Sequence, residues 1–251
     1  MNILVCIKRV PATAGKIELT ADAQAIDTRY LGFTISPHEE CAVEEAVRLV
    51  EKYGGAATVL TLGPAAAEEQ LRDALAMGAA HAVLLETDGG EWDPGATARA
   101  IVDAVRARPT PFDLLLFGNE AADSGDYQVG VRVAHALDLP CVTGVKSLEI
   151  MGGRALARRE AAGFMEEFEV ELPAVFTVRE GLNLPRYVPL LGRMKAKKKP
   201  VERARPEFAG NAIERVRLKL PPEQGSRVEI LGSGPDAAPA AAAMLRAMGL
   251  L

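Results

Sequence analysis

The sequence has few aromatic residues and few cysteines. Phe, Trp and Tyr make up 5% of the 251 residues, so a core must be built mainly from aliphatic side chains. Cys6, Cys41 and Cys141 are far apart and form no C-x-x-C pair, which disfavours a disulfide framework or a zinc site. This usage is typical of a reducing compartment. We expect a cytoplasmic protein, or one of the mitochondrial matrix if the source is eukaryotic.

Long apolar runs are also missing. No run approaches the roughly 18 residues that are needed to cross a bilayer. The N-terminal residues MNILVCIKRV lack the long apolar segment and the cleavage site of a secretory signal. With 49% hydrophobic and 25% charged residues the composition is that of a globular protein, and the length allows one full core with a small appendage. We expect a protein that is not itself a membrane protein.

Several catalytic and nucleotide-binding motifs are absent. The sequence contains neither G-x-G-x-x-G after its first apolar run nor a G-x-x-x-x-G-K-[ST] P-loop. It also lacks a G-x-S-x-G elbow and an H-E-x-x-H pair, and no nucleophile–base pair stands out. These absences disfavour an ATP-dependent enzyme. They predict a protein without a catalytic site of its own.

Short apolar runs alternate with amphipathic helices in the first half of the chain. The predicted strands cover residues 2–7, 57–62, 81–87 and 113–118, and the predicted helices between them cover residues 37–53, 65–79 and 93–108. Ser36, Pro37 and Glu39 have the spacing of a capping box with proline at the first helical position. Apolar strands that alternate with such helices predict an α/β fold with a parallel sheet covered by helices on both faces.

The alternation of strands and helices ends after Leu139. Strand-like pieces are predicted at residues 142–150, 154–160 and 168–172, and residues 173–178 predict one more core strand. Past Pro200 the chain is rich in Pro, Arg and Glu and ends in an alanine-rich helix. A tail with so little apolar patterning cannot form its own core, so we expect it to lie along another surface.

Ligands of an open parallel sheet bind beyond the carboxyl ends of its strands, where the strand order reverses. Residues 6–10, 36–39, 62–64 and 118–130 follow such ends. The last segment, GNEAADSGDYQVG, runs into a helix whose free N–H groups suit a phosphate, and Gln128 adds a side-chain donor. Alternatively, Asp123, Ser124 and Asp126 only cap that helix.

A basic segment stands out in this acidic protein. The chain has a net charge of −5, yet residues 186–199 hold six basic residues and no acidic one. Nucleic-acid binding is disfavoured because only Tyr187 supplies an aromatic ring and the rest of the chain is strongly acidic. We expect the lysines to face an acidic protein surface. Leu190 and Leu191 either pack on the sheet or remain exposed.

At this point several motifs together resemble one family. CIKRV, PHEECAVEEAVRL, ALAMGA, LLLFGNEAADSGDYQVG, LPAVFTVREGLNLPRY and MKAKKKP occur in this order over about residues 1–200. They closely resemble the β subunit of electron transfer flavoprotein, and the pairing of LN-x-PRY with MKAKKK is highly specific. The last 50 or so residues resemble the family only in kind.

The resemblance implies a heterodimer with an α subunit. One FAD, held mostly by the α subunit, would carry electrons from flavin dehydrogenases to a membrane quinone oxidoreductase, and the β subunit would hold a structural AMP. The implied core is an adenine nucleotide α-hydrolase-like sheet at residues 1–183. It would be followed by a recognition arm at 184–200 and a C-terminal arm at 201–251 that packs on the α subunit.

Carried over by position, the resemblance implies a set of nucleotide contacts at the strand ends. They are Cys6, Ser36, Pro37, His38, Glu39, Leu62, Gly118, Asn119, Glu120, Ala121, Ala122, Asp123, Ser124, Gly125, Asp126, Tyr127, Gln128 and Val129. Ser36 and His38 replace the Asn and Phe that are commoner in the family, and DSGDYQVG departs from the DDDxNQTG form of AMP-binding members. Electron-bifurcating members, which hold a second FAD in place of AMP, tend to read Q-V-G here. Both ligands therefore remain open.

The resemblance also gives the basic segment a role. In the family this segment anchors a dehydrogenase through an exposed leucine, which corresponds to Leu190. The implied partner contacts are Tyr187, Pro189, Leu190, Leu191 and Arg193. A different class of protein, a free-standing adenine nucleotide-binding protein of the universal-stress type, shares the sheet architecture but has no use for the arm or the tail.

Overall fold

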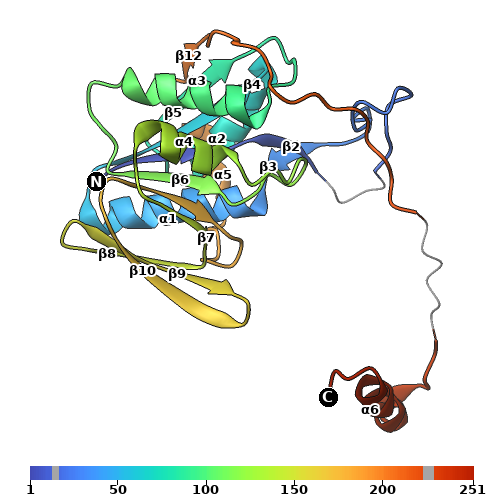
Figure 1. Ribbon diagram of the computed structural model, residues 1–251. Helices are drawn as coiled ribbons and strands as arrows, with labels where there is room; N and C mark the ends of the chain where they lie inside the picture. The colour runs from blue at the N-terminus through green and yellow to red at the C-terminus, as the bar shows by residue number, and fades with distance from the viewer. Residues whose placement is uncertain (13–16, 223–228) are drawn as a thin grey trace.

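The computed structural model describes residues 1–12, 17–222 and 229–251 (Figure 1). A seven-stranded sheet forms its centre, with the order β12-β5-β4-β1-β6-β11-β7 and every neighbouring pair parallel. The strands are β1 (Asn2–Cys6), β4 (Ala56–Gly63), β5 (His81–Glu86), β6 (Leu114–Gly118), β7 (Cys141–Val145), β11 (Ala174–Val178) and β12 (Glu202–Ala204). The parallel α/β fold expected from the sequence is confirmed.

Helices cover both faces of this sheet, as predicted. They are α1 (Pro37–Tyr53), α2 (Glu68–Met77), which a 3₁₀ turn at Ala65–Ala67 precedes, α3 (Pro94–Arg106) and α4 (Val129–Leu137). Alternate residues of β1 point to opposite faces: Ile3 and Val5 pack with the α1 and α2 side, and Leu4 with the α3 and α4 side. Burial on both faces explains why the strands read as continuous apolar runs.

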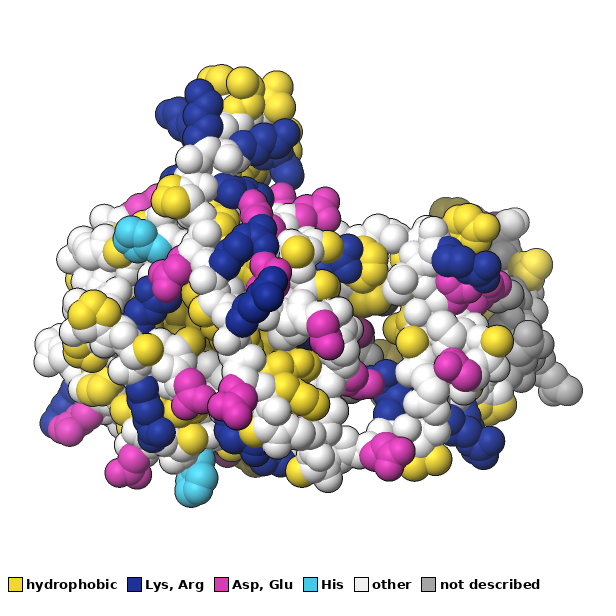
Figure 2. Space-filling view, turned by 90° about the horizontal axis from the view of Figure 1, so that it is seen from above, with side chains coloured by type: hydrophobic (Ala, Val, Ile, Leu, Met, Phe, Trp, Pro, Cys, Tyr) yellow, Lys and Arg dark blue, Asp and Glu magenta, His cyan; other side chains and the backbone are white. Residues whose placement is uncertain are grey.

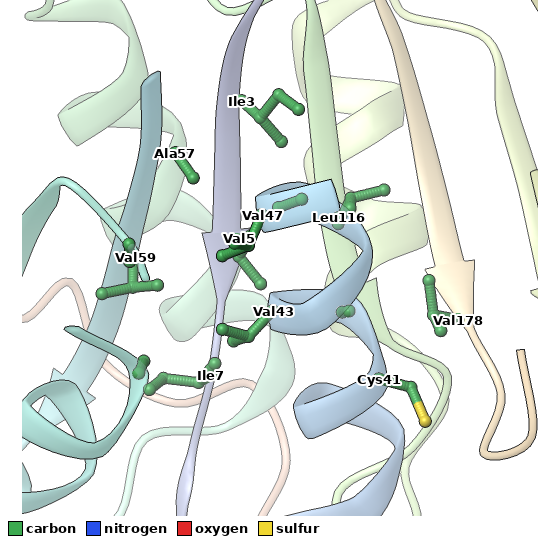
Figure 3. Packing of buried hydrophobic residues seen from close by; sticks show 14 of the residues in the cluster. Ile3, Val5, Ile7, Cys41, Val43, Val47, Ala57, Val59, Leu116 and Val178 are labelled. Carbon is green, nitrogen blue, oxygen red and sulfur yellow. The ribbon is translucent and has the colours of Figure 1, made fainter. Parts of the chain in front are cut away.

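The core under α1 is built from small aliphatic side chains (Figure 3). Val43 and Val47 of α1 face Val5 of β1, and all three are buried. The start of α1 is formed as the capping-box spacing predicts, because the Ser36 N–H donates to the Glu39 carboxylate at 3.4 Å. With few aromatic residues available, closely packed Val, Leu, Ile and Ala side chains fill the core.

Two smaller sheets flank the main one. β2 (Arg9–Pro11) and β3 (Phe33–Ile35) pair antiparallel, and β8 (Ser147–Met151), β9 (Arg154–Ala161) and β10 (Phe164–Glu171) form an antiparallel sheet. The single strand predicted at residues 142–150 is therefore wrong, because β7 and β8 belong to different sheets. Gly144 has a left-handed φ of +71° and the Lys146 N–H donates to the Arg158 carbonyl, which turns the chain out of the main sheet.

The last quarter of the chain combines the arm, defined as residues 184–200, with a long tail. The arm contains α5 (Leu190–Ala196), and the tail contains β12, a 3₁₀ turn at Gly234–Ala237 and α6 (Ala238–Ala247). β12 adds a parallel edge to β5, and the Asp93 carboxylate accepts the Ala212 N–H at 2.6 Å. The tail then runs past the loop before β3, where the Leu218 N–H donates to the Ala23 carbonyl at 2.8 Å, and α6 lies apart from the sheet in Figure 1. Residues 223–228 of the expected C-terminal arm lie outside the described residues.

No helix within the described ranges is long and apolar enough to cross a membrane.

Candidate functional site

The strand order places one crevice at β1 and β6. Along the chain β4 and β5 add to one side of β1, whereas β6 adds to the other side, so the order reverses between β1 and β6. Cys6 ends β1, Gly118 ends β6, and α1 begins nearby at Pro37. Parallel α/β sheets bind ligands at such a point. The strand-end rule applied to the sequence thus brings residues from three separate segments to one edge.

Glu39 ties these segments together. Its carboxylate accepts the N–H of Lys8 at 2.9 Å, just past β1, and the N–H of Ser36 at 3.4 Å. A Cβ on Gly118 would come 2.6 Å from the Glu39 Cγ, so the end of β6 lies directly against this side chain. Because a contact below 3 Å is not tolerated, position 118 requires glycine for the close approach. Glu39 is 6% exposed and holds the base of the crevice.

Burial changes the proton affinity of this carboxyl group. Loss of hydration raises the pKa of Glu39 to about 8, with a further rise from the charge of Asp123, against the hydrogen bonds from Lys8 and Ser36. Glu39 is therefore mostly protonated and neutral at pH 7. Burial, and then the charge that Glu39 carries once it ionises at higher pH, also raise the pKa of the Cys6 thiol above its ordinary value, so the thiol remains neutral.

The loop after β6 folds over the start of α1. Ser36 Oγ donates to the Glu120 carbonyl at 3.4 Å, and His38 Nε2 lies 3.3 Å from the Glu120 carboxylate. Lys8 Nζ binds Asp123 at 2.8 Å. The predicted residues Cys6, Ser36, His38, Glu39 and 118–123 are thus brought together around one edge. Leu62 lies at the end of β4, on the far side of β1.

The first turn of α4 opens onto the same loop. Gln128 occupies the N-cap, but its side-chain oxygen accepts from Arg132, and among the described residues no side chain caps this helix. Asp123 instead accepts the Ser124 N–H at 2.8 Å and binds Lys8. The alternative that the loop acidic residues only cap α4 is therefore wrong. The first turn keeps free N–H groups, which can bind an anion.

A cavity of about 430 Å³ lies on the other side of this loop, beyond the ends of β7 and β11. Asn119 and Tyr127 from the predicted set line it, together with residues that the sequence analysis missed: Val131, Thr143, Gly144, Arg159, Glu160, Ala161 and Arg179. Arg179 directly follows β11, so the strand-end rule could have found it. Arg159 comes from β9, and no sequence motif announces its position.

The arm leaves the body along α1. Asn183 donates to the Cys41 carbonyl at 3.0 Å and to Glu45 at 2.9 Å, and the Arg48 guanidinium donates to the Leu184 carbonyl at 3.0 Å. Arg186 binds Glu44 at 2.8 Å and Glu51 at 2.7 Å. These contacts fix where the arm starts.

The tip of the arm points outward (Figure 2). Leu190 and Leu191 are 73% and 70% exposed, and Tyr187 is 91% exposed. Seen from above, hydrophobic and basic side chains gather on a lobe that projects from the body. Pro189 precedes α5, and Arg193 binds Asp73 at 3.0 Å. The alternative that Leu190 and Leu191 pack on the sheet is therefore wrong.

Comparison with known proteins agrees with these features. A family model described as the electron transfer flavoprotein domain matches residues 25–209. The chain is 37% identical to the electron transfer flavoprotein subunit beta of Bacillus subtilis, over 98% of each chain. It is 38% identical to the subunit beta of Syntrophomonas wolfei, over 92% of this chain and 90% of the relative. It is 34% identical to the human subunit beta, over 92% of each chain.

Proposed function

Because this chain belongs to the β-subunit family of electron transfer flavoproteins, we propose that it pairs with an α subunit to form a carrier. The FAD, held mainly by the α subunit, takes electrons from flavin dehydrogenases and passes them to a membrane quinone oxidoreductase. The β subunit has no catalytic site of its own. The observation that carries this proposal is the projecting arm, whose exposed leucines Leu190 and Leu191 offer an apolar surface that another protein can bind.

The crevice between β1 and β6 supports a structural AMP. The first turn of α4 offers free N–H groups to a phosphate, and the Lys8–Asp123 ion pair lies at the same edge. Glu39, which would repel an anion if ionised, is mostly neutral at pH 7 because its pKa is about 8. In this proposal the nucleotide joins β1, α1 and the loop after β6 and takes no part in electron transfer.

The tail supports the pairing with an α subunit. Within the described residues α6 has no buried side chain, and Met244, Leu245 and Met248 are all exposed. An apolar helix that is exposed in the isolated chain normally packs on another protein. We assign that surface to the α subunit.

A second candidate, an electron-bifurcating subunit with a second FAD, gains support from the cavity. Asn119 and Tyr127 link the loop after β6 to about 430 Å³ of additional space. A dinucleotide needs more room than AMP, so this space favours the larger ligand. The identity of the bound molecule, AMP or a second FAD, distinguishes the two candidates.

The test is to produce the chain together with an α-type subunit and to extract the bound molecules. We expect a yellow heterodimer that releases one FAD and one AMP per pair. Two FAD molecules and no AMP would support the bifurcating subunit instead. A colourless monomer that binds ATP would contradict both candidates and favour the universal-stress type of protein.

Glu39→Gln is expected to remove a pH dependence of stability. The pKa of Glu39 is about 8 in the folded protein against an ordinary value of 4.5, so the folded chain holds the extra proton between these pH values. Its contribution to stability is full below about pH 4.5 and is lost as the pH rises through about 8. Glutamine keeps an acceptor for the Lys8 and Ser36 N–H groups but cannot ionise.

Thermal unfolding and nucleotide content at about pH 6 and about pH 9 measure this effect. The wild-type complex should lose more of both at the higher pH than the Glu39→Gln complex. Glu171→Gln, a change in the flanking sheet at a side chain that is 79% exposed and does not line the cavity, serves as the control and should follow the wild type. Equal losses in the wild type and Glu39→Gln would show that Glu39 does not titrate in this range.

A further inference from the structure

The arm is held at its far end as well as at its start, and one arginine of α2 supplies that hold. Arg72 Nη1 donates to the Ala196 carbonyl at 2.7 Å and also to the Lys199 carbonyl. The last carbonyls of a helix have no partner within it, and a cation placed there binds them well. We propose that Arg72 is a positioning residue that sets the direction of the arm and so presents Leu190 to a dehydrogenase. This inference rests on the proposed carrier function.

The guanidinium of Arg72 is itself fixed. Glu68, one helical turn earlier, accepts from Arg72 Nε at 3.0 Å and from Nη2 at 2.7 Å. The other oxygen of Glu68 binds Arg203 of β12. Arg72 is three-quarters buried, so solvent screens these bonds less than those of a surface pair. Because the guanidinium group is planar and Glu68 holds its Nε and Nη2 atoms, the direction of Nη1 toward the Ala196 and Lys199 carbonyls is fixed.

The neighbouring contacts leave α5 little freedom at its base. Ala196 is buried, and Lys199 Nζ donates to the Ala79 carbonyl at 2.6 Å. The other link to α2, between Arg193 and Asp73, is about half exposed on both sides and contributes little. Arg72 is thus the side chain of α2 that binds the end of α5 from a largely buried position, and Lys199 adds a second bond from the lysine run to the body.

Fixing the end of α5 to the body affects how tightly the exposed Leu190 can bind a partner. Docking requires that Leu190 lose its freedom to move, and the affinity falls by the free energy of that ordering. Because the bonds from Arg72 already hold α5 in place, less free energy is spent on ordering Leu190 when it docks. Removing the Arg72 fork should therefore weaken docking without changing the flavin or the rate of electron transfer within the docked complex.

The experiment uses the heterodimer with Arg72→Gln and, as a matched control, Arg106→Gln. Arg106 Nη2 also donates to a carbonyl near a helix end, that of Ala136 at 2.7 Å, but it lies on α3, on the other face of the sheet. The probe is a flavin dehydrogenase that reduces the wild-type complex. We expect the KM for the Arg72→Gln complex to rise about tenfold, with kcat and flavin content unchanged. Arg106→Gln should leave KM unchanged.

A double-variant cycle separates positioning from general stability. If Arg72 acts through Leu190, the double variant with Leu190→Ala should have a KM no more than about twofold above that of Leu190→Ala alone. Losses that multiply would mean that Arg72 acts elsewhere and would overturn the inference. Arg72→Lys, which keeps the charge but loses the fork, replaces Arg72→Gln if the latter does not fold.

Amide hydrogen exchange gives a readout that needs no dehydrogenase. The N–H groups of Lys197, Lys198 and Lys199 are bonded within the end of the arm. Arg72→Gln should speed their exchange about tenfold or more, and Arg106→Gln should not. Unchanged exchange together with unchanged KM would overturn the role of Arg72.

The outcome for Leu190→Ala distinguishes this inference from the proposed function. If Leu190→Ala slows reduction but Arg72→Gln does not, the role of Arg72 is wrong and the docking role of the arm stands. If Leu190→Ala itself has no effect, the docking role fails and the inference fails with it.

Discussion

Replacing Leu190 with alanine is expected to lower kcat/KM for reduction by a dehydrogenase about 30-fold. Leu190 is 73% exposed, so its truncation removes little packing within the chain and should leave fold and flavin content intact. An apolar anchor that fills a partner's pocket typically contributes at least about 2 kcal/mol, and about 1.4 kcal/mol corresponds to a factor of ten. Steady-state reduction of the heterodimer at varied concentration measures the change.

Leu184→Ala is the matched control for this prediction. Leu184 is also in the arm and is also exposed, but it precedes Pro185 and lies beside α1 rather than at the tip. Its truncation should change kcat/KM less than about twofold. An equal effect of the two substitutions would mean that the whole arm, and not one anchor, binds the dehydrogenase. No effect of Leu190→Ala would remove the docking role.

Glu44→Ala is expected to lower the free energy of unfolding by about 3 kcal/mol, the low end for a broken buried pair. Glu44 is 2% exposed and binds Arg48 at 2.6 Å and Arg186 at 2.8 Å, and it also accepts the Arg186 N–H at 3.1 Å. The change leaves both guanidinium groups without this partner. Thermal unfolding should show a midpoint lower by about 6–12 °C.

The pH dependence provides an independent check on Glu44. Burial raises its pKa, but hydrogen bonds from Arg186 and Arg48 outweigh burial and hold the pKa below its ordinary value of 4.5. The stabilisation is therefore present above about pH 4.5 and is lost as the pH falls through the folded-state pKa. The difference in the free energy of unfolding between the wild type and Glu44→Ala should become smaller at acidic pH.

Glu51→Ala is the control for Glu44→Ala. Glu51 binds the same Arg186, but it is more than half exposed, so its loss should cost less than about 1 kcal/mol. If the two substitutions destabilise the chain equally, burial does not strengthen the Glu44 contacts. If the loss of unfolding free energy caused by Glu44→Ala stays the same at acidic pH, the ion pairs of Glu44 are not the source of that loss.

Local signals in the sequence were enough to predict the main elements. The start of α1 follows from Ser36, Pro37 and Glu39, because a cap depends only on neighbouring residues. The order of the strands does not follow in this way. β11 comes after β7 in the chain but inserts between β6 and β7, and only long-range pairing decides that. β12 has exposed side chains and joins the sheet through its backbone, so no apolar pattern reveals it.

The candidate site was partly predictable for a similar reason. Strand ends can be read from the sequence, which gave Cys6, Ser36 and the loop after β6. The capping-box spacing identified Glu39, but not its bond to Lys8 or its contact with Gly118, because both join segments that are distant in sequence. Arg159 enters the neighbouring cavity from an antiparallel sheet whose position depends on the turn at Gly144.

The exposed helix at the end of the tail bears on how a cell must supply this protein. Under the proposed pairing with an α subunit, a copy made without that subunit would display the apolar α6, which is the kind of surface that chaperones bind and proteases attack. Surplus copies should be short-lived, and the amount of the scarcer chain should set the amount of carrier. Synthesis of both chains from one messenger RNA would then reduce the degradation of unpaired copies.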